Sequence, residues 1–253
     1  MAKLRLDLAY DGTDLRGWAK QPGHRTVEGE LLSVLEPMLG VTPRVSVAGR
    51  TDAGVHASGQ VASFEADAEP EAIRSVLNGR LAPEVVVSRA RVVPDGFDAR
   101  FSASWREYVY SIRTGEPDPF TARFSWQRPG ELGLGDMRAA ARVLLGEHDF
   151  ASFGRATSPD GTTVRRIHRL SMARSGNEIR ITIRANAFLR QMVRSLVGTL
   201  VEVGQGRIRA GALPEIISAG DRSAAGRVAP PQGLCLVHVA YAADRAGTLD
   251  TPQ

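Results

Sequence analysis

The sequence has a single cysteine and no long apolar run, and both absences narrow what the chain can be. Cys235 alone cannot form an internal disulfide, and no metal-ligand spacing surrounds it. No stretch approaches the roughly 18 consecutive apolar residues that a membrane-spanning helix needs, and residues 1–10 alternate like a strand instead of resembling a signal peptide. We therefore expect a globular cytoplasmic protein that holds no metal, with Cys235 in a core strand.

Lysine is scarce, because 30 of the 32 basic residues are arginine. A GC-rich genome would produce this bias, but guanidinium groups also suit bidentate contacts with phosphate. The formal net charge is only +4, yet residues 155–209 contain eleven arginines and three acidic residues, which gives 11 − 3 = +8 for that segment. So basic a segment predicts a surface for a polyanion, with Arg165 and Arg166 among its candidate RNA contacts.

Common cofactor motifs are also missing. Gly49 and Gly54 have the spacing of the two P-loop glycines, but Val55 and His56 follow where Lys and Ser or Thr would stand. No Gly-x-Gly-x-x-Gly opens a helix, and the histidines stand at no metal or triad spacing, so we assign them no role.

The periodicity of the apolar residues predicts the order β-α-β-β-α-β twice in one chain of 253 residues, 43% of them hydrophobic. In the first half we expect strands at 3–10, 44–48, 60–65 and 85–93, and helices starting at Val27, after a Thr26 cap, and at Pro70. In the second half we expect strands at 105–113, 166–174, 178–184 and 233–241, and helices at 136–145, 186–203 and 213–219.

This pattern predicts an α+β protein of two duplicated ferredoxin-like (split βαβ) halves. They would form a mixed, mainly antiparallel sheet with helices and a central cleft. The predicted domains are 1–104, which carries the glycine-rich loop described next, and 105–243, which is basic. Residues 116–135 and 154–163 are expected to be irregular, and 244–253 a disordered polar tail.

The loop at residues 49–59 contains three glycines between two predicted strands and holds one carboxylate, that of Asp52. Glycines let a backbone approach a ligand and adopt positive φ, and flanking strands fix a side chain in space. An ordinary hairpin connection is the alternative, but a two-residue turn needs only Asn-Gly or Gly-X. The charged pair Arg50 and Asp52 in a longer loop favours a functional site.

The string Gly49-Arg50-Thr51-Asp52-Ala53-Gly54-Val55-His56-Ala57 resembles the signature of the TruA-type tRNA pseudouridine synthases. The resemblance continues at Phe97-Asp98-Ala99-Arg100-Phe101-Ser102-Ala103, Arg106-Glu107-Tyr108-Val109-Tyr110, Asn186-Ala187-Phe188-Leu189-Arg190-Gln191-Met192-Val193-Arg194 and Ala229-Pro230-Pro231-Gln232-Gly233-Leu234. It departs at Ala19, where the family's Gly-Trp-Gln-x-Gln has glutamine.

The resemblance implies an isomerase that converts uridine to pseudouridine in the anticodon arm of tRNA, at positions 38, 39 and 40, with no cofactor and no metal. It implies a homodimer, because these enzymes bind tRNA across two subunits. It also assigns Asp52 as the catalytic residue. Whether this carboxylate adds to the base, adds to the ribose or abstracts a sugar proton stays open.

Further site residues follow from the same resemblance. Burial disfavours an ionised carboxylate, and the family pairs its aspartate with a basic residue, here Arg194. On the predicted helix Arg194 shares a face with Ala187, Arg190 and Gly198, and a solvated arginine on an amphipathic helix is the alternative. Tyr108 would stack on the extruded base and bring its phenol to the reacting ring, or else pack in the core.

Arg50, Phe97, Arg100 and Phe101 resemble RNA contacts of the family, whereas by pattern alone the two phenylalanines would be core residues. Two other functions stay open at this point. A non-catalytic RNA-binding protein on the same fold would need nothing special at Asp52, and it lacks an RRM signature. A small-molecule isomerase would leave the basic segment 155–209 unexplained.

Overall fold

The computed structural model describes residues 1–156, 161–242 and 244. The chain divides into two compact units, the first formed by Met1–Arg106 with Leu236–Gln253 and the second by Glu107–Cys235. The first unit contains β1 (Ala2–Tyr10), α1 (Val27–Leu39), β2 (Ser46–Val47), β3 (His56–Ala66), α2 (Pro70–Leu81), β4 (Val85–Val92) and most of β10 (Leu234–Tyr241). The second contains most of β5 (Ala103–Arg113), then β6 (Trp126–Gln127), α3 (Leu134–Arg142), β7 (Gly146–Asp149), β8 (Val164–Ser175), β9 (Glu178–Ala185), α4 (Met192–Gly204) and α5 (Leu213–Ala219).

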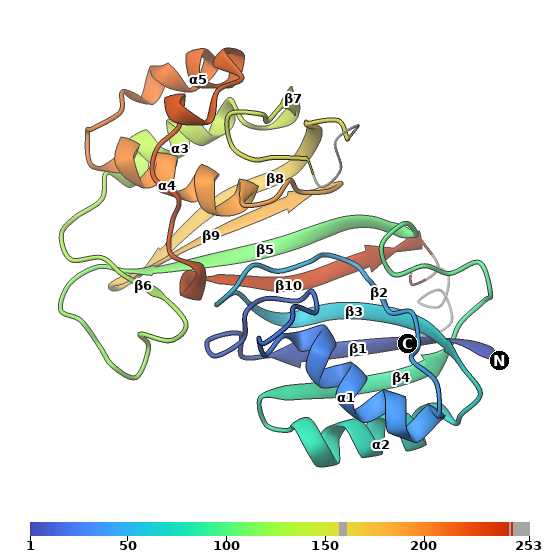
Figure 1. The fold of residues 1–253 in the computed structure, drawn as a ribbon. Coiled ribbons are helices and arrows are strands. Elements are labelled where there is room, and N and C mark those ends of the chain that lie inside the picture. Colours follow the sequence, from blue (N-terminus) through green and yellow to red (C-terminus); the bar gives the residue numbers. More distant parts are fainter. Residues whose placement is uncertain (157–160, 243, 245–253) are drawn as a thin grey trace, which may run out of the picture. The chain divides into compact units, whose positions relative to one another are not determined.

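The sheet of the first unit has the strand order β4-β1-β3, with β2 and β10 also next to β3. β1 is antiparallel to both β3 and β4, and β2 is antiparallel to β3. Figure 1 shows α1 and α2 on the same side of these strands. This is the β-α-β-β-α-β arrangement expected for the first half, and the α+β fold class is confirmed.

Local signals in the sequence explain where these two helices begin. The Thr26 hydroxyl accepts a hydrogen bond from the Gly29 N–H at 3.1 Å, as a helix N-cap should. Gly40 ends α1 in the left-handed conformation, with φ at 69°. Pro70 stands in the first turn of α2, where its missing N–H costs no hydrogen bond.

The second unit has the strand order β5-β9-β8-β7, so β9 lies between β5 and β8. β8 and β9 form the predicted hairpin, turned at Gly176 with φ at 55°. β6 is parallel to β5. Figure 1 shows α3 and α4 side by side, with α5 next to them. Nearly every residue of α4 is buried, because the helix lies in the core of this unit.

One helix is shorter than predicted, because α4 begins at Met192 and not at residue 186. The Asn186 carboxamide accepts the N–H groups of Arg166 and Ala187, which holds the chain in a turn after β9. Gln191 then adopts a positive φ of 63°, a conformation incompatible with a continuous helix. The predicted helical face shared by Arg194 with Ala187 and Arg190 is therefore wrong, and only its Gly198 neighbour is on the helix.

The glycine-rich loop is also shorter than predicted. β3 begins at His56, so the loop ends at Val55, and β2 covers only Ser46–Val47 of the expected strand 44–48. Gly59 belongs to β3 and not to the loop. A Cβ atom there would lie 2.2 Å from the Val237 carbonyl oxygen on β10, so this glycine permits close strand packing.

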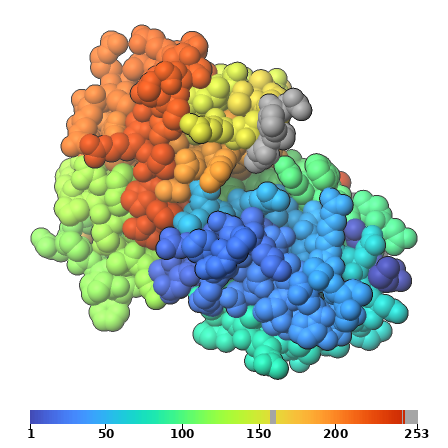
Figure 2. Space-filling model, in the orientation of Figure 1, coloured from blue at the N-terminus to red at the C-terminus, as the bar shows by residue number. Residues whose placement is uncertain are grey.

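The irregular connection at 116–135 contains only the short strand β6 and the first residues of α3. In Figure 2 its yellow-green atoms form part of the outer surface of the second unit, and Phe120 is 91% exposed. Of the predicted irregular segment 154–163, residues 157–160 lie outside the described residues, as do 245–253 of the predicted tail. Asp244 is described, and its carboxylate pairs with Arg5 at 2.9 Å and Arg91 at 3.0 Å.

Within the described residues, no helix is long and apolar enough to cross a bilayer.

Candidate active site

Asp52 lies in the loop between β2 and β3, where main-chain hydrogen bonds on both sides of it hold the backbone. The Thr51 carbonyl accepts the Trp18 N–H at 3.0 Å, and the Gly54 N–H donates to the Leu15 carbonyl at 3.1 Å. Gly17 has a φ of 89°, and a Cβ atom there would lie 2.7 Å from the Thr51 carbonyl oxygen. Segment 15–18 can therefore approach the Asp52 loop only because position 17 is glycine.

Beneath the loop, three buried side chains form a polar network. The Tyr10 hydroxyl lies 2.8 Å from Thr51 Oγ1, and the Gln60 amide donates to the Tyr10 hydroxyl at 3.2 Å and to the Gly49 carbonyl at 2.8 Å. Gln60 is fully buried. Because a satisfied buried network strongly favours one geometry, it fixes the positions of Gly49 and Thr51 next to Asp52.

His56 supports the other end of the loop. Its Nδ1 accepts the Gly12 N–H at 3.0 Å, the Asp11 carboxylate is 3.1 Å from the same nitrogen, and the ring is buried. A Cβ atom at Gly12 would lie 2.1 Å from the Val55 carbonyl oxygen. This histidine, to which the sequence analysis gives no role, is part of the scaffold that holds the loop.

Arg106 joins the Asp52 loop to segment 97–103. Its side chain is 8% exposed, and its Nε donates to the Ala48 carbonyl at 3.0 Å. Its terminal nitrogens donate to the carbonyls of Ala103, at 3.3 Å, and Arg100. One buried guanidinium thereby ties the start of the loop to the start of β5.

Asp98 shapes the turn that presents Arg100 and Phe101. Its Oδ1 accepts the N–H of Arg100 at 2.7 Å, the N–H of Phe101 at 2.9 Å and the hydroxyl of Ser46 at 3.0 Å. Partial burial raises the pKa of this carboxyl, but the hydrogen bonds from Phe101, Ser46 and Arg100 outweigh it, so the pKa is lowered. The ionised carboxylate is therefore the form that holds the turn.

The two phenylalanines of this segment differ in exposure. The Phe101 ring is 81% exposed and lies under the Arg100 guanidinium at 5.4 Å, whereas the pattern alone predicts a core residue. The Phe97 ring is 9% exposed and packs against Tyr241 with 4.9 Å between centroids. Phe97 is therefore largely buried, as the pattern alone predicts, and its role as an RNA contact stays a prediction. Arg50 is exposed.

In the second unit, the structure fixes Arg194 by contacts with a segment far away in the sequence. Its Nε donates to the Ala229 carbonyl at 2.8 Å, and its own carbonyl accepts the Ala229 N–H at 3.0 Å. The Tyr108 ring is mostly buried and meets Phe188 edge to face at 5.1 Å, which orients its plane.

The two predicted RNA-binding arginines of β8 have different surroundings. Arg165 is partly buried and donates to the carbonyls of Thr162 at 2.8 Å and Val164 at 2.6 Å, and burial lowers its pKa. Arg166 is exposed and pairs with Glu147 at 3.2 Å. Arg166 is therefore the more accessible of the two to a phosphate.

Comparisons with known proteins decide the family. A family model described as tRNA pseudouridine synthase matches residues 140–242. The chain is 41% identical over 244 residues to tRNA pseudouridine synthase A of Geotalea daltonii, which covers 95% of this chain and 100% of that protein. The chain belongs to the tRNA pseudouridine synthase A family. A member from Brevibacillus brevis is 42% identical over 244 residues, with the same coverage of both chains.

Among solved structures, an H/ACA RNP bound to a substrate RNA containing 2′-deoxyuridine is 12% identical with a TM-score of 0.37. This similarity covers 77% of this chain and 44% of that one, and it is too low to support a conclusion.

In this family member, the predicted site residues fall in both units. Asp52, Arg50, Arg100 and Phe101 belong to the first unit, and Tyr108, Arg165, Arg166 and Arg194 to the second. Their catalytic and RNA-binding roles stay predictions. The sequence alone does not mark the residues that hold the loop, which are Tyr10, Gly12, Gly17, Thr51, His56, Gln60 and Arg106. Within residues 1–156, 161–242 and 244, no group of His, Cys, Asp and Glu could hold a metal ion.

Proposed function

We propose that this protein is an isomerase that converts uridine to pseudouridine in the anticodon arm of tRNA, at positions 38, 39 and 40. The observation that carries the proposal is the position of Asp52. Its carboxylate stands on a loop held by main-chain hydrogen bonds from Trp18 and to Leu15, above a buried polar network. Preorganisation of this kind is what a nucleophile or base requires, because a misplacement of about 1 Å can cost two orders of magnitude in rate.

The reaction breaks the bond between uracil N1 and ribose C1′ and forms a bond between C5 and C1′. The proton on C5 is lost and N1 gains one, so no oxidant or reductant is consumed. The target uridine is first extruded from its stack. Asp52 then acts as nucleophile or base while the glycosidic bond breaks, and the uracil rotates before it rejoins through carbon.

Arg194 is the basic catalytic residue of this proposal, and Tyr108 offers a ring for stacking and a phenol. The exposed Phe101 ring, with the Arg100 guanidinium on it, is suited to an unpaired base. Arg50, Arg165 and Arg166 contact the phosphate backbone. We propose further that the enzyme works in the cytoplasm as a homodimer, which is the commonest symmetric assembly.

The comparisons with known proteins give no support to the alternative, a non-catalytic RNA-binding protein on the same fold.

The test replaces Asp52 by asparagine, which keeps size and hydrogen-bonding capacity but removes the charge and the nucleophile. Turnover is measured by tritium release from tRNA labelled at uracil C5, beside a binding titration and a thermal melt. Asp67→Asn is the matched control, because Asp67 is an exposed carboxylate of the same unit. We expect Asp52→Asn to lose turnover and keep its affinity for tRNA, and the control to behave like the wild type.

Substantial turnover by Asp52→Asn would refute the catalytic assignment. If the wild type and both variants bind tRNA and none forms pseudouridine, the protein only binds RNA. If Asp52→Asn instead melts early, with a loss of about 3 to 5 kcal/mol as expected for a broken buried ion pair, Asp52 has a structural role.

A further inference from the structure

A pocket in the second unit contains none of the residues assigned to the active site. It has a volume of about 390 Å³, within the range of roughly 300 to 1,000 Å³ typical of small-ligand sites. Its walls are the second half of α4 with the residues that follow it, the strand β6, and the segment that follows the short 3-10 helix η2 (Arg222–Ala224). They are formed by Trp126, Arg128, Gly198, Val201, Glu202, Gln205, Arg207, Arg227, Val228 and Pro230.

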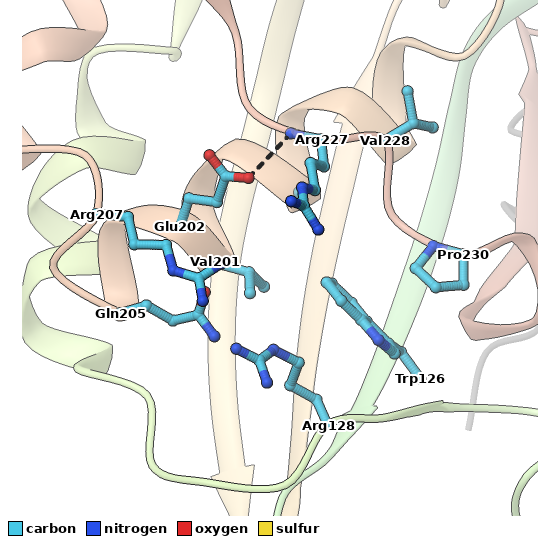
Figure 3. A pocket seen from close by; sticks show the side chains of 10 residues that line it. Trp126, Arg128, Val201, Glu202, Gln205, Arg207, Arg227, Val228 and Pro230 are labelled. Carbon is cyan, nitrogen blue, oxygen red and sulfur yellow. Dashed lines mark hydrogen bonds between the residues drawn. The ribbon is translucent and has the colours of Figure 1, made fainter.

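The charge in this pocket favours an anion. Three arginines and one glutamate line it, which gives 3 − 1 = +2. Figure 3 shows the guanidinium groups of Arg128, Arg207 and Arg227 directed toward the space between them and Trp126. In the described part of the chain, no carboxylate forms an ion pair with any of these three arginines. The Glu202 carboxylate instead accepts the Arg227 main-chain N–H, at 3.2 Å.

The wall that carries Arg227 is fixed against α4. A Cβ atom at Gly198 would lie 1.7 Å from the Arg227 carbonyl oxygen, so only glycine allows the helix and this segment to meet. The Thr199 hydroxyl accepts the Gly226 N–H at 2.9 Å, which holds the preceding residue. Position 227 therefore has a defined backbone although its side chain is exposed.

The opposite wall is formed by Trp126, whose indole ring is partly exposed. β6 pairs with β5 through Trp126 and Ile112, and the indole meets the Tyr110 ring edge to face at 6.3 Å. Burial raises the pKa of the Tyr110 phenol, with only partial opposition from the charge of Arg194, and the phenol donates to the Pro230 carbonyl at 2.8 Å. These contacts hold the indole ring in place beside the arginines.

One feature opposes anion binding, because the carboxyl end of a helix carries partial negative charge. Here the residues that follow α4 donate hydrogen bonds to the last main-chain carbonyls of the helix. Val201 and Val203 accept N–H groups from residues 205 and 206, and Glu202 accepts those of Arg207 at 2.9 Å and Ile208 at 3.3 Å. These bonds satisfy the helix end, and the net charge of the lining stays positive.

We propose that this pocket binds a phosphorylated nucleotide, with the base stacked on Trp126 and the phosphate held by Arg128, Arg207 and Arg227. A planar aromatic ring beside several guanidinium groups is the combination that recognises a base and its phosphate. The same chemistry is offered by an unpaired nucleotide in an RNA strand and by a free nucleotide. The pocket would therefore be a second nucleotide site that does not involve Asp52.

The experiment titrates the full-length protein with adenosine 5′-monophosphate, adenosine, inorganic phosphate and a single-stranded oligoadenylate trimer. Adenine is chosen because it does not resemble the uridine substrate. The variants are Trp126→Leu, Trp126→Phe and the double variant Arg128→Gln, Arg227→Gln. Arg209→Gln is the control for loss of one surface charge, because Arg209 is 84% exposed and lies outside the lining. A change in the Trp126 indole signal in NMR spectra locates the binding site.

We expect the nucleotide or the trimer to bind and to perturb the Trp126 signal. Trp126→Leu should weaken binding by roughly 5- to 150-fold, the loss expected for one stacked base. Trp126→Phe should restore most of the affinity, and the arginine double variant should bind at least about tenfold more weakly. Binding of the trimer alone would identify an RNA strand as the source, and equal binding of the monophosphate would identify a free nucleotide.

Equal affinity of the wild type and the double variant would overturn the proposal, as would binding of adenosine as tight as that of its monophosphate. If inorganic phosphate binds as tightly as the nucleotide, stacking on the Trp126 indole contributes nothing to the affinity, and the proposal is also overturned. Asp52 does not line this pocket, so an inactive Asp52→Asn protein should still bind the nucleotide there. The titrations also measure binding and not turnover. Failure here and failure of the proposed isomerase activity are thus distinguishable.

Discussion

Replacement of Gly17 by alanine tests whether segment 15–18 positions the loop that carries Asp52, the proposed catalytic residue. Gly17 has a φ of 89°, and a Cβ atom there would lie 2.7 Å from the Thr51 carbonyl oxygen and 3.1 Å from the Ala53 nitrogen. The left-handed conformation costs an alanine about 1 to 2 kcal/mol, and overpacking against fixed backbone adds about 1 to 3 kcal/mol. To relieve the contact, the backbone on both sides of Asp52 must move by a few tenths of an ångström or more.

Gly23→Ala is the matched control, because Gly23 also has a positive φ, 72°, and a Cβ atom there would meet nothing within 4 Å. Both variants should be destabilised by the cost of the left-handed conformation, and only Gly17→Ala should also be destabilised by overpacking against the backbone. A displaced catalytic group lowers the rate steeply, so we expect Gly17→Ala to reduce kcat by about 10- to 100-fold and Gly23→Ala to leave it within about twofold.

Urea unfolding gives the two stabilities, and tritium release from tRNA labelled at uracil C5 gives kcat. The measurement is made at a temperature at which both variants are fully folded, so that a lower rate does not reflect unfolded protein. If Gly17→Ala turns over as fast as Gly23→Ala, the contact of segment 15–18 with the loop does not position Asp52, and the reasoning fails.

Three further predictions concern pH, salt and assembly. The pKa of Asp98 is lowered in the folded protein, so the ionised carboxylate stabilises the fold at pH values above its ordinary pKa of 3.8. This stabilisation is lost as the pH falls through the folded pKa. In urea titrations, Asp98→Asn should therefore be less stable than the wild type at pH 7, and the difference should shrink below about pH 4. The affinity for tRNA should fall steeply with salt, and Arg165→Gln with Arg166→Gln should lower the logarithmic slope by about 1.4 to 1.8, whereas an unchanged slope would place the RNA elsewhere. Sedimentation at micromolar concentration should show a dimer, and a monomer both without and with tRNA would refute it.

The elements with strong local signals could be predicted from the sequence. Thr26 and Pro70 mark helix starts by their own chemistry, and Gly176 supplies the positive φ of the β8–β9 turn. The charged pair Arg50 and Asp52, in a loop longer than a two-residue turn, is also visible in the sequence alone, while the role of Asp52 stays a prediction. These features depend on a few neighbouring residues, so tertiary contacts did not alter them.

Features that depend on distant contacts could not be predicted. Gly59 resembles a loop residue until Val237, far along the chain, is found against it. The residues before Met192 have helical propensity. The Asn186 carboxamide oxygen accepts the Ala187 N–H, however, and the Arg190 N–H donates to the Arg155 carbonyl, and these bonds hold the segment in another conformation. Gln60 has no local mark of its contact with Gly49, because that contact forms only when β3 lies beside the loop.

The place of β10 in the first unit has a consequence for synthesis on the ribosome. β3 ends at Ala66, and the part of its neighbour β10 that belongs to this unit begins at Leu236, so 236 − 66 − 1 = 169 residues lie between them. At about 5 to 20 residues per second, translation of that interval takes roughly 10 to 30 s. During that time β3 has an unpaired edge beside Gly59, and the backbone groups that β10 will bind are open to other strands. The strand β3, which follows the Asp52 loop, thus gains its last neighbouring strand only when almost the whole chain described here has been made.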